Sequence, residues 1–409
     1  MKKLLLLSLP LAFLIGCNRQ ANNKIVIGTI DSIHSNILNE ERKIWVYVPE
    51  EDQGNIFSKQ KYPVVYLLDG DAHFFSVVGM IQQLSSVNGN NICPKMIVVG
   101  IPNTDRTRDL TPTHVDADPP FMDSASSKTS GGGEHFTSFI EKELMPYIDS
   151  LYPTSPYRML IGHSFGGLTV MNVLINHPRL FNSYIAIDPS MWWDHQKLLK
   201  EVQQDSALKN YDSISLFLGI ANTMEKGMDT LGVKKDTSGN TKHIRSILAL
   251  NASLNAGKMN GLNFNSKYYK DDNHGSVPLI AEYDALHFIF DFYKLDINFR
   301  EVFEGNLDLD KVLIEHYKVV SQHFGYLVTP PEDLVNSFGY TLLNQKKYDK
   351  AEALFKMNIA NYPQSFNVYD SMGDFYVKKG NKEQAIENYK KALSIKDFPD
   401  TKQKLDKLL

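Results

Sequence analysis

Hydrophobic residues follow two different patterns along the chain. In the first and longer part, short continuous apolar runs alternate with stretches of mixed polarity. The runs lie at residues 62–68, 96–101, 159–161, 184–187, 214–220 and 264–269. Continuous runs of this length are typical of parallel strands buried on both faces, and the stretches between them predict helices. Residues 24–36 and 41–48 alternate instead and predict two antiparallel strands. We therefore expect an α/β architecture with a doubly wound and mostly parallel sheet.

The last part of the chain repeats with a period of 34 residues. Gly339 and Gly373 are one period apart. The residues around them match in kind: Phe338 with Met372, Leu342 with Tyr376, Ala351 with Ala385, and Phe355 with Tyr389. This period and pattern predict tetratricopeptide-like helix pairs, a small all-α domain. Because about three repeats are needed for independent stability, we expect the two units to pack on the rest of the chain.

A sharp turn separates the apolar run at 159–161 from a helical stretch that begins near Leu168. The turn has the sequence GHSFGG at residues 162–167. In a G-x-S-x-G turn between a strand and a helix, the glycines leave room for a strained serine whose hydroxyl stands clear of the sheet. Ser164 is therefore the candidate nucleophile. The alternative is a tight turn whose serine only caps the helix.

The candidate base and acid follow the nucleophile in the chain order that this fold uses: serine, acid, histidine. His274 is the downstream histidine that lies in a loop directly after a late strand, so we expect it to act as the base. The acid should follow the strand at 214–220, where Glu225 is the first carboxylate and Asp229 the alternative. A serine–histidine pair without any carboxylate also stays open.

Two backbone N–H groups are expected to stabilise the oxyanion of the reaction. One belongs to Phe165, directly after the nucleophile, and the other to Asp71, in the loop after the first buried run, where Gly70 allows close approach. Asp69, Asp71 and His73 are also spaced closely enough to suggest a metal. No second cluster at ligand spacing accompanies them, so we expect no metal.

Candidate substrate-binding residues are few. Trp192 and Trp193 follow a strand end and are expected to wall the pocket, with core packing as the alternative. Arg108, like Arg106, could bind an anionic group. The structural alternative is that both arginines pair with their acidic neighbours and hold the long polar loop at 103–133. The three glycines that end this loop are expected to form a flexible joint.

The N-terminus is similar to a bacterial lipoprotein signal. Two lysines precede an apolar run at 4–15, which ends in Gly16 and Cys17. We expect residues 1–16 to be removed as a signal peptide and Cys17 to be lipidated, anchoring the protein in the bacterial cell envelope on the periplasmic side or at the outer membrane. The alternative is a cytoplasmic protein with an apolar start. Two cysteines exclude a disulfide framework, and a formal net charge of -4 gives no sign of nucleic-acid binding.

Five motifs together resemble the putative esterase family, which includes esterase D-like and enterochelin esterases. They are YLLDG at 66–70, VGIPNTDRTRDLTP at 99–112, GHSFGG at 162–167, DPSMWW at 188–193 and DNHG at 272–275. The resemblance spans about residues 24–295 and implies hydrolysis of carboxylic esters by Ser164 and His274 without a metal or organic cofactor. Enterochelin esterases are often described as using a serine–histidine pair, which keeps Glu225 open. The leader and the repeats depart from the plain enterochelin pattern and leave the siderophore substrate open.

These features predict four segments: a signal peptide at 1–16, a hydrolase domain at 17–295, a helical connector at 296–332 and tetratricopeptide-like repeats at 333–409. The expected function is that of a serine esterase of the bacterial envelope, acting on siderophore or acylated-sugar esters. An acyltransferase of the same fold and an envelope scaffold with a vestigial active site are the alternatives. The repeats are expected to bind a protein partner, to self-associate or to brace the chain.

Overall fold

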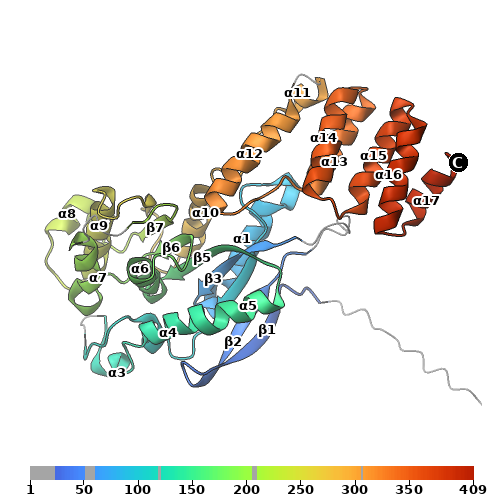
Figure 1. Cartoon of the computed structure of the whole chain (residues 1–409). Coiled ribbons are helices and arrows are strands. Elements are labelled where there is room, and N and C mark those ends of the chain that lie inside the picture. The colour runs from blue at the N-terminus through green and yellow to red at the C-terminus, as the bar shows by residue number, and fades with distance from the viewer. Residues whose placement is uncertain (1–23, 51–59, 118–120, 205–209, 305–306) are drawn as a thin grey trace, which may run out of the picture.

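The computed structural model describes residues 24–50, 60–117, 121–204, 210–304 and 307–409 (Figure 1). The predicted signal peptide and Cys17 lie outside these residues. An α/β part with one large sheet comes first, and Figure 1 shows the C-terminal helices α13 to α17 side by side beyond it. None of the helices in the described ranges combines the length and the apolar character that a membrane crossing requires.

The sheet has eight strands in the order β1-β2-β4-β3-β5-β6-β7-β8. The strands are β1 (Thr29–Ser35), β2 (Glu40–Tyr47), β3 (Tyr62–Leu68), β4 (Ile97–Ile101), β5 (Thr154–His163), β6 (Ser183–Ile187), β7 (Ser215–Ala221) and β8 (Asn263–Tyr269). The β1–β2 and β2–β4 pairs are antiparallel, and all the other pairs are parallel. The predicted mostly parallel, doubly wound sheet is confirmed.

Helices cover both faces of the sheet. In the α/β part they are α1 (Gly70–Ser85), α2 (Arg106–Leu110), α3 (Ser124–Ser127), α4 (Gly133–Phe139), α5 (Met145–Leu151), α6 (Phe165–Asn176), α7 (Trp193–Gln204), α8 (Thr230–Lys235), α9 (Lys242–Asn255) and α10 (Val277–Ile289). A short π-helical stretch, Ile140–Leu144, joins α4 to α5, and a 3-10 turn, Val87–Gly89, follows α1.

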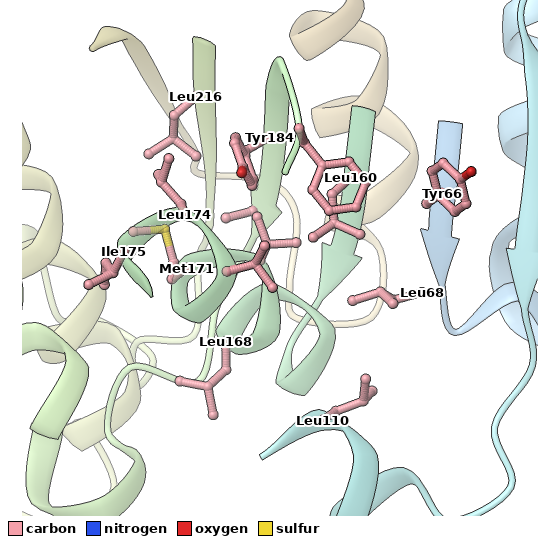
Figure 2. Packing of buried hydrophobic residues seen from close by; sticks show 14 of the residues in the cluster. Tyr66, Leu68, Leu110, Leu160, Leu168, Met171, Leu174, Ile175, Tyr184 and Leu216 are labelled. Atoms are coloured by element: carbon pink, nitrogen blue, oxygen red, sulfur yellow. The ribbon is translucent and has the colours of Figure 1, made fainter. Parts of the chain in front are cut away.

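The period of two in β3 explains how both faces are buried. Tyr66 and Leu68 belong to the core beneath α6, whereas Val65 and Leu67 belong to the core beneath α1 and α10. Figure 2 shows the first of these cores, where the apolar side chains of α6 lie against the strands. A strand that is apolar at every position is stable only between two such layers.

The C-terminal part is helical throughout. Its helices are α11 (Phe299–Glu304), α12 (Leu309–Phe324), α13 (Glu332–Asn344), α14 (Tyr348–Asn361), α15 (Phe366–Lys379), α16 (Lys382–Ile395) and α17 (Pro399–Asp406). A Cβ atom on Gly339 would collide with the ring of Phe355, and one on Gly373 would collide with the ring of Tyr389. The repeated glycines therefore allow α13 to meet α14, and α15 to meet α16, at close range.

The helical part packs directly on the hydrolase-like part. The ring of Phe324, at the end of α12, lies 4.8 Å from that of Tyr157 on β5 and 6.3 Å from that of Phe290 after α10. The hydroxyl of Tyr326 donates to Ser155 Oγ at 2.9 Å. One buried apolar cluster continues from the sheet through α12 into the repeats. Two repeats thus gain from the rest of the chain the apolar contacts that a longer array would supply itself.

Candidate active site

Ser164 occupies the turn between β5 and α6. Its φ and ψ angles are 61° and -114°, a strained conformation for a residue with a side chain. A Cβ atom on Gly162 would collide with the backbone of Gly166, so the turn closes this tightly only because glycine stands there. The Ser164 N–H donates to the carbonyl of Ile187 at 3.0 Å and fixes the turn on the neighbouring strand β6. Backbone strain of this kind is maintained where it positions a reacting group.

His274 lies in the turn between β8 and α10 and contacts a buried carboxylate. Its Nδ1 is 2.6 Å from Oδ2 of Asp188, which follows β6 and is fully buried. The Asp188 Oδ1 atom accepts the N–H of Ala221 at 3.0 Å. An ionised carboxylate only accepts hydrogen bonds, so Nδ1 of His274 carries the hydrogen and Nε2 keeps its lone pair. This is the arrangement that a general base requires.

Glu225 is not the partner of His274. It lies in the loop after β7, and its Oε1 accepts the side-chain amide of Asn240 at 3.1 Å. The alternative, Asp229, caps α8 by accepting the N–H groups of Leu231 and Gly232. The structure therefore corrects the assignment of the acid from Glu225 to Asp188. The acid comes from the end of β6 instead of β7, one strand nearer to Ser164.

Asp188 is the first residue of the DPSMWW motif in the sequence. Within that motif, only the two tryptophans are predicted as site residues from the sequence. The missed signal was a carboxylate directly after the buried run that follows the nucleophile in the chain. In a parallel sheet that position lies at the same edge as the nucleophile.

A second histidine also contacts the acid. His243, on α9, is almost fully buried, and its Nε2 lies 2.9 Å from the same Oδ2 atom of Asp188. Burial alone would raise the pKa of Asp188, but the hydrogen bonds from His243 and His274 outweigh it and hold the pKa well below its usual range. Asp188 is thus ionised at neutral pH despite its burial. His243 was absent from the expected site residues.

A third imidazole lies against that of His274. The ring of His163, the residue before the nucleophile, is 4.5 Å from the ring of His274, measured between centroids. Burial and, secondarily, the neighbouring imidazoles of His274 and His73 lower the pKa of His163 to about 4. His163 is therefore neutral at physiological pH, and it packs beside His274 without competing for its proton.

The carboxylate and imidazoles at this edge fit hydrogen bonding better than metal binding. The ligand atoms of Asp188, His243 and His274 all lie within 4.8 Å of one another. Both ring nitrogens, however, face one carboxylate oxygen at hydrogen-bond distance, which is the geometry of two N–H donors. In the acidic turn after β3, Asp69 is held by an ion pair with Arg106.

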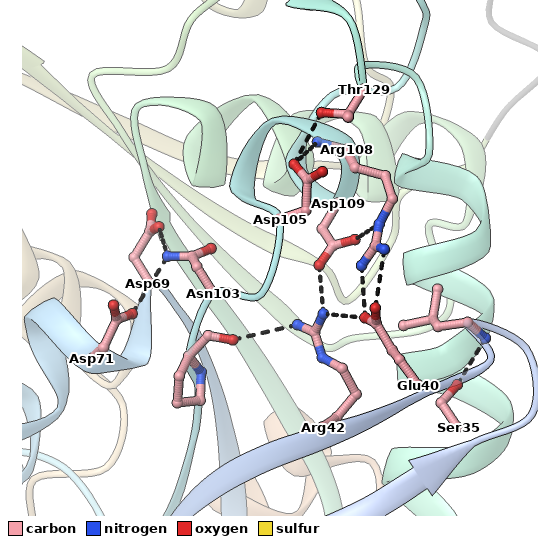
Figure 3. A network of polar contacts seen from close by, with 12 residues as sticks. Ser35, Glu40, Arg42, Asp69, Asp71, Asn103, Asp105, Arg108, Asp109 and Thr129 are labelled. Carbon is pink, nitrogen blue, oxygen red and sulfur yellow. Dashed lines mark hydrogen bonds and ion pairs between the residues drawn. The ribbon is translucent and has the colours of Figure 1, made fainter. Parts of the chain in front are cut away.

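Asp71 lies in the first turn of α1, which starts directly after β3. The first N–H groups of a helix have no intrahelical acceptor, and the same holds for Phe165 at the start of α6. The turn before α1 is fixed by Asp69, whose carboxylate accepts Arg106 Nε at 2.7 Å. It also accepts Asn103 Nδ2 at 2.7 Å (Figure 3). Gly70 allows close approach, but to the backbone of β4. Asp71 and Phe165 remain the predicted oxyanion donors.

The two tryptophans have different surroundings. Trp193 packs in the core, and its Nε1 donates to the carbonyl of Thr113 at 3.1 Å. The ring of Trp192 lies 4.9 Å from that of Phe121, which is 41% exposed, and the ammonium of Lys242 lies 5.6 Å from the Trp192 ring. Trp192 thus backs an aromatic surface near the site, whereas Trp193 follows the core-packing alternative.

Arg108 is engaged in structural ion pairs. Its guanidinium donates to both carboxylate oxygens of Glu40, at 2.6 and 3.0 Å, and to Asp109 at 2.7 Å. Buried Arg42 completes this network through Asp109 at 2.6 Å (Figure 3). The structural alternative for Arg108 therefore applies, and its assignment to substrate binding is corrected. A Cβ atom on Gly132 would collide with Arg108, so these glycines provide close packing where a flexible joint was expected.

Family models match two parts of the chain. Residues 35–233 match the model described as putative esterase, and residues 366–398 match a tetratricopeptide repeat. The first match includes Ser164 and Asp188 and ends before His274.

Three curated relatives are siderophore esterases by name. The chain is 31% identical over 151 residues to the siderophore enterobactin esterase of Emericella nidulans, covering 34% of this chain and 50% of that protein. It is 35% identical over 172 residues to the ferri-bacillibactin esterase BesA of Bacillus subtilis, covering 38% and 58%. The chain thus spans about half the length of the curated relatives it matches.

A solved structure resembles the chain over most of its length. It is an IroE-like serine hydrolase from Shewanella oneidensis, 31% identical, covering 81% of this chain and 98% of that one with a TM-score of 0.66. An uncharacterised protein from Capnocytophaga ochracea, 18% identical, shares the fold over 93% of this chain and 99% of its own, with a TM-score of 0.59. With these motifs, this sheet and these relatives, the chain belongs to the putative esterase family.

Proposed function

We propose that the protein is a serine esterase that hydrolyses carboxylic esters of siderophores. The observation that carries this proposal is the arrangement at one edge of the sheet. A strained serine, Ser164, follows β5, and the ring of the residue before it, His163, lies 4.5 Å from that of His274. His274, after β8, is bonded to the buried, ionised Asp188, after β6. A serine hydroxyl is a weak nucleophile, so this geometry has chemical meaning only together with a base.

The reaction follows from the positions of these groups. Ser164 Oγ attacks the ester carbonyl while Nε2 of His274 takes its proton, and Asp188 stabilises the resulting imidazolium. The N–H groups of Phe165 and Asp71 hold the negative oxygen of the tetrahedral intermediate. When the intermediate collapses, the alcohol leaves with the proton from His274. Water, activated by the same imidazole, then releases the acid from the acyl-enzyme.

The siderophore substrate is supported by the relatives and by the surface near the site. Three of the matched relatives are named as esterases of enterobactin, ferri-bacillibactin and triacetylfusarinine C. Phe121 presents an exposed aromatic ring backed by buried Trp192, and the ammonium of Lys242 lies 5.6 Å from the Trp192 ring. Such a surface suits an aromatic or anionic ligand. Acylated sugars are the competing ester class.

We further propose that Cys17 carries the lipid that holds the enzyme at the envelope, and that the repeats contact a protein partner. The first rests on the sequence at residues 1–17 and the second on the match to a tetratricopeptide repeat. Globomycin treatment of cells expressing the full chain, followed by gel mobility, tests the anchor: processing that is blocked by the drug and by Cys17→Ser supports it. Processing indifferent to both would exclude it.

The central test compares the chain from Asn18 onward with its Ser164→Ala variant on p-nitrophenyl acetate and butyrate. We expect turnover by the first and a loss of about 10⁴-fold or more in kcat for the second. The enzyme is then given ferric catecholate siderophores and, in parallel, acylated sugars. Chromatography of the products shows which of the two substrate classes it hydrolyses. Added alcohol acceptors distinguish hydrolysis from acyl transfer. A folded wild-type chain that turns over none of these esters would exclude the proposal.

A further inference from the structure

One oxygen of the buried acid accepts hydrogen bonds from two histidines, of which the proposed reaction uses only one. Oδ2 of Asp188 lies 2.6 Å from His274 Nδ1 and 2.9 Å from His243 Nε2. The other oxygen, Oδ1, accepts the N–H of Ala221. The family relationship assigns no role to His243, and no step of the mechanism above involves it.

We propose that His243 is a positioning residue that fixes the orientation and the charge of Asp188. This inference rests on the proposed esterase function, because its effect passes through His274. An ionised carboxylate accepts from both rings only if His243 carries its hydrogen on Nε2. His243 is thereby a second N–H donor to the acid, bonded to the same oxygen as His274.

Burial makes this second bond strong. Asp188 is fully buried and His243 is 8% exposed, so no bulk water replaces a missing donor. Hydrogen bonds to charged groups are stronger than neutral ones, and leaving a buried charge short of donors is costly. With Ala221 on one oxygen and His243 on the other, the carboxylate plane is held fixed. His274 then meets an acceptor that does not rotate away.

The second bond also sets how strongly Asp188 acts on His274. A donor on Oδ2 disperses the negative charge, so the carboxylate stabilises the imidazolium of His274 less than a carboxylate bonded to His274 alone. The ring of His243 stands edge-on to that of His274, 5.2 Å away between centroids, and limits its movement. The ionisable groups around His274 include Asp188 after β6, His243 on α9 and His163 on β5. Two more, His73 on α1 and Asp69 after β3, act on His163.

Two substitutions separate a donor from mere packing. His243→Leu removes the N–H, while His243→Gln keeps an amide N–H in about the place of Nε2. We expect His243→Leu to lower kcat on p-nitrophenyl butyrate by roughly 10- to 100-fold, with KM changed by less than about twofold. We expect the acid limb of its kcat/KM profile to move to higher pH, because Asp188 then acts on His274 alone. His243→Gln should recover most of the rate and return the limb toward the wild-type position.

A matched control is His177→Leu. His177 follows the far end of α6 and also bonds a carboxylate, with Nε2 2.9 Å from Glu134. Its removal should leave kcat within about twofold and the pH profile unmoved. Equal losses in the Leu and Gln variants of His243, or a Leu variant with wild-type rate and profile, would overturn the positioning role.

A spectroscopic measurement tests the inference even if no ester is turned over. Imidazole N–H protons bonded to a buried carboxylate resonate far downfield of amide protons. With ¹⁵N-labelled histidine, the wild-type chain should show two such signals, from His274 and His243. His243→Gln should lose one and keep the other. A spectrum with a single downfield imidazole signal that persists in His243→Gln would refute the two-donor arrangement, whatever the activity.

Discussion

Two buried aspartates in this protein accept hydrogen bonds from different side chains, one from guanidinium groups and the other from imidazoles. Asp109 is 1% exposed and accepts from the guanidinium groups of Arg42 and Arg108, at 2.6 and 2.7 Å. Asp188 is fully buried and accepts from the imidazoles of His243 and His274. Guanidinium stays charged at any physiological pH, whereas imidazole exchanges a proton near neutrality.

The kind of partner distinguishes a structural ion-pair network, at Asp109, from a cluster that can exchange a proton, at Asp188. The Asp109 network connects β2 with α2 (Figure 3). The guanidinium of Arg42 also lies over the rings of Phe136 and Phe139 on α4. The Asp109 network fixes the conformation of the loop that contains α2. None of its groups exchanges a proton near neutral pH. The Asp188 cluster is built so that one of its donors can gain and lose a proton while the other stays in place. Substitutions of the two aspartates should therefore fail in different ways.

The largest expected effect is on the rate. Asp188→Asn should lower kcat by about 10⁴-fold, because an amide at this position favours the wrong tautomer of His274. The matched control is Glu225→Gln, which should stay within about twofold of wild type since Glu225 bonds Asn240 in the loop after β7. Steady-state hydrolysis of p-nitrophenyl butyrate by both variants measures this. The opposite ranking would restore Glu225 as the acid.

Asp109→Asn should instead act on stability. Removing the charge of Asp109 leaves buried Arg42 paired with Glu40 alone, and breaking a buried ion pair costs up to about 3–5 kcal/mol. Denaturant unfolding should show this loss, while Asp116→Asn, at an exposed carboxylate, should change the free energy of unfolding by less than about 0.5 kcal/mol. A variant at Asp109 with wild-type stability but a large loss of kcat would show that this network belongs to the site.

The parts of this molecule that the sequence predicted correctly are those whose cause is local. The turn at Ser164 needs glycine two residues before and two residues after it, and the strand and helix on either side have their own apolar patterns. The helix pairs of the C-terminal part follow similarly, because the contact of Gly373 with Tyr389 lies within one repeat. The residues that determine each of these features lie close together in the sequence.

The identity of the acid depends on contacts between distant segments. Carboxylates follow β3, β6 and β7 at the same edge, as Asp69, Asp188 and Glu225. Which one meets His274 depends on how far the loop after β8 reaches back across the sheet. The same limit applies to the glycines at 131–133, since a glycine that permits close packing looks the same in sequence as one that permits motion.

A third buried carboxylate, that of Glu282, is paired with neither a guanidinium nor an imidazole among the described residues. Glu282 lies on α10, is 2% exposed, and its Oε2 is buried without a hydrogen-bond partner among the described residues. Burial raises the pKa of Glu282 to about 8. With a carboxyl pKa near 4.3 in the unfolded chain, the folded protein keeps a proton that the unfolded protein loses. Stability should therefore fall as pH rises from about 4.3 toward 8.

Glu282→Gln should abolish that dependence. The amide is neutral at every pH, so the variant should be more stable than wild type at pH 8, by an amount on the order of a few kcal/mol, and nearly equal to it below pH 4. Thermal or denaturant unfolding across this range measures the difference, with the exposed Glu141→Gln as the control that should leave the curve unchanged. A wild-type curve that is flat between pH 5 and 8 would mean that Glu282 finds a partner in solution. Glu282 would then resemble Asp109 and Asp188 in having a hydrogen-bond donor. The three carboxylates would differ only in the kind of donor that they accept from.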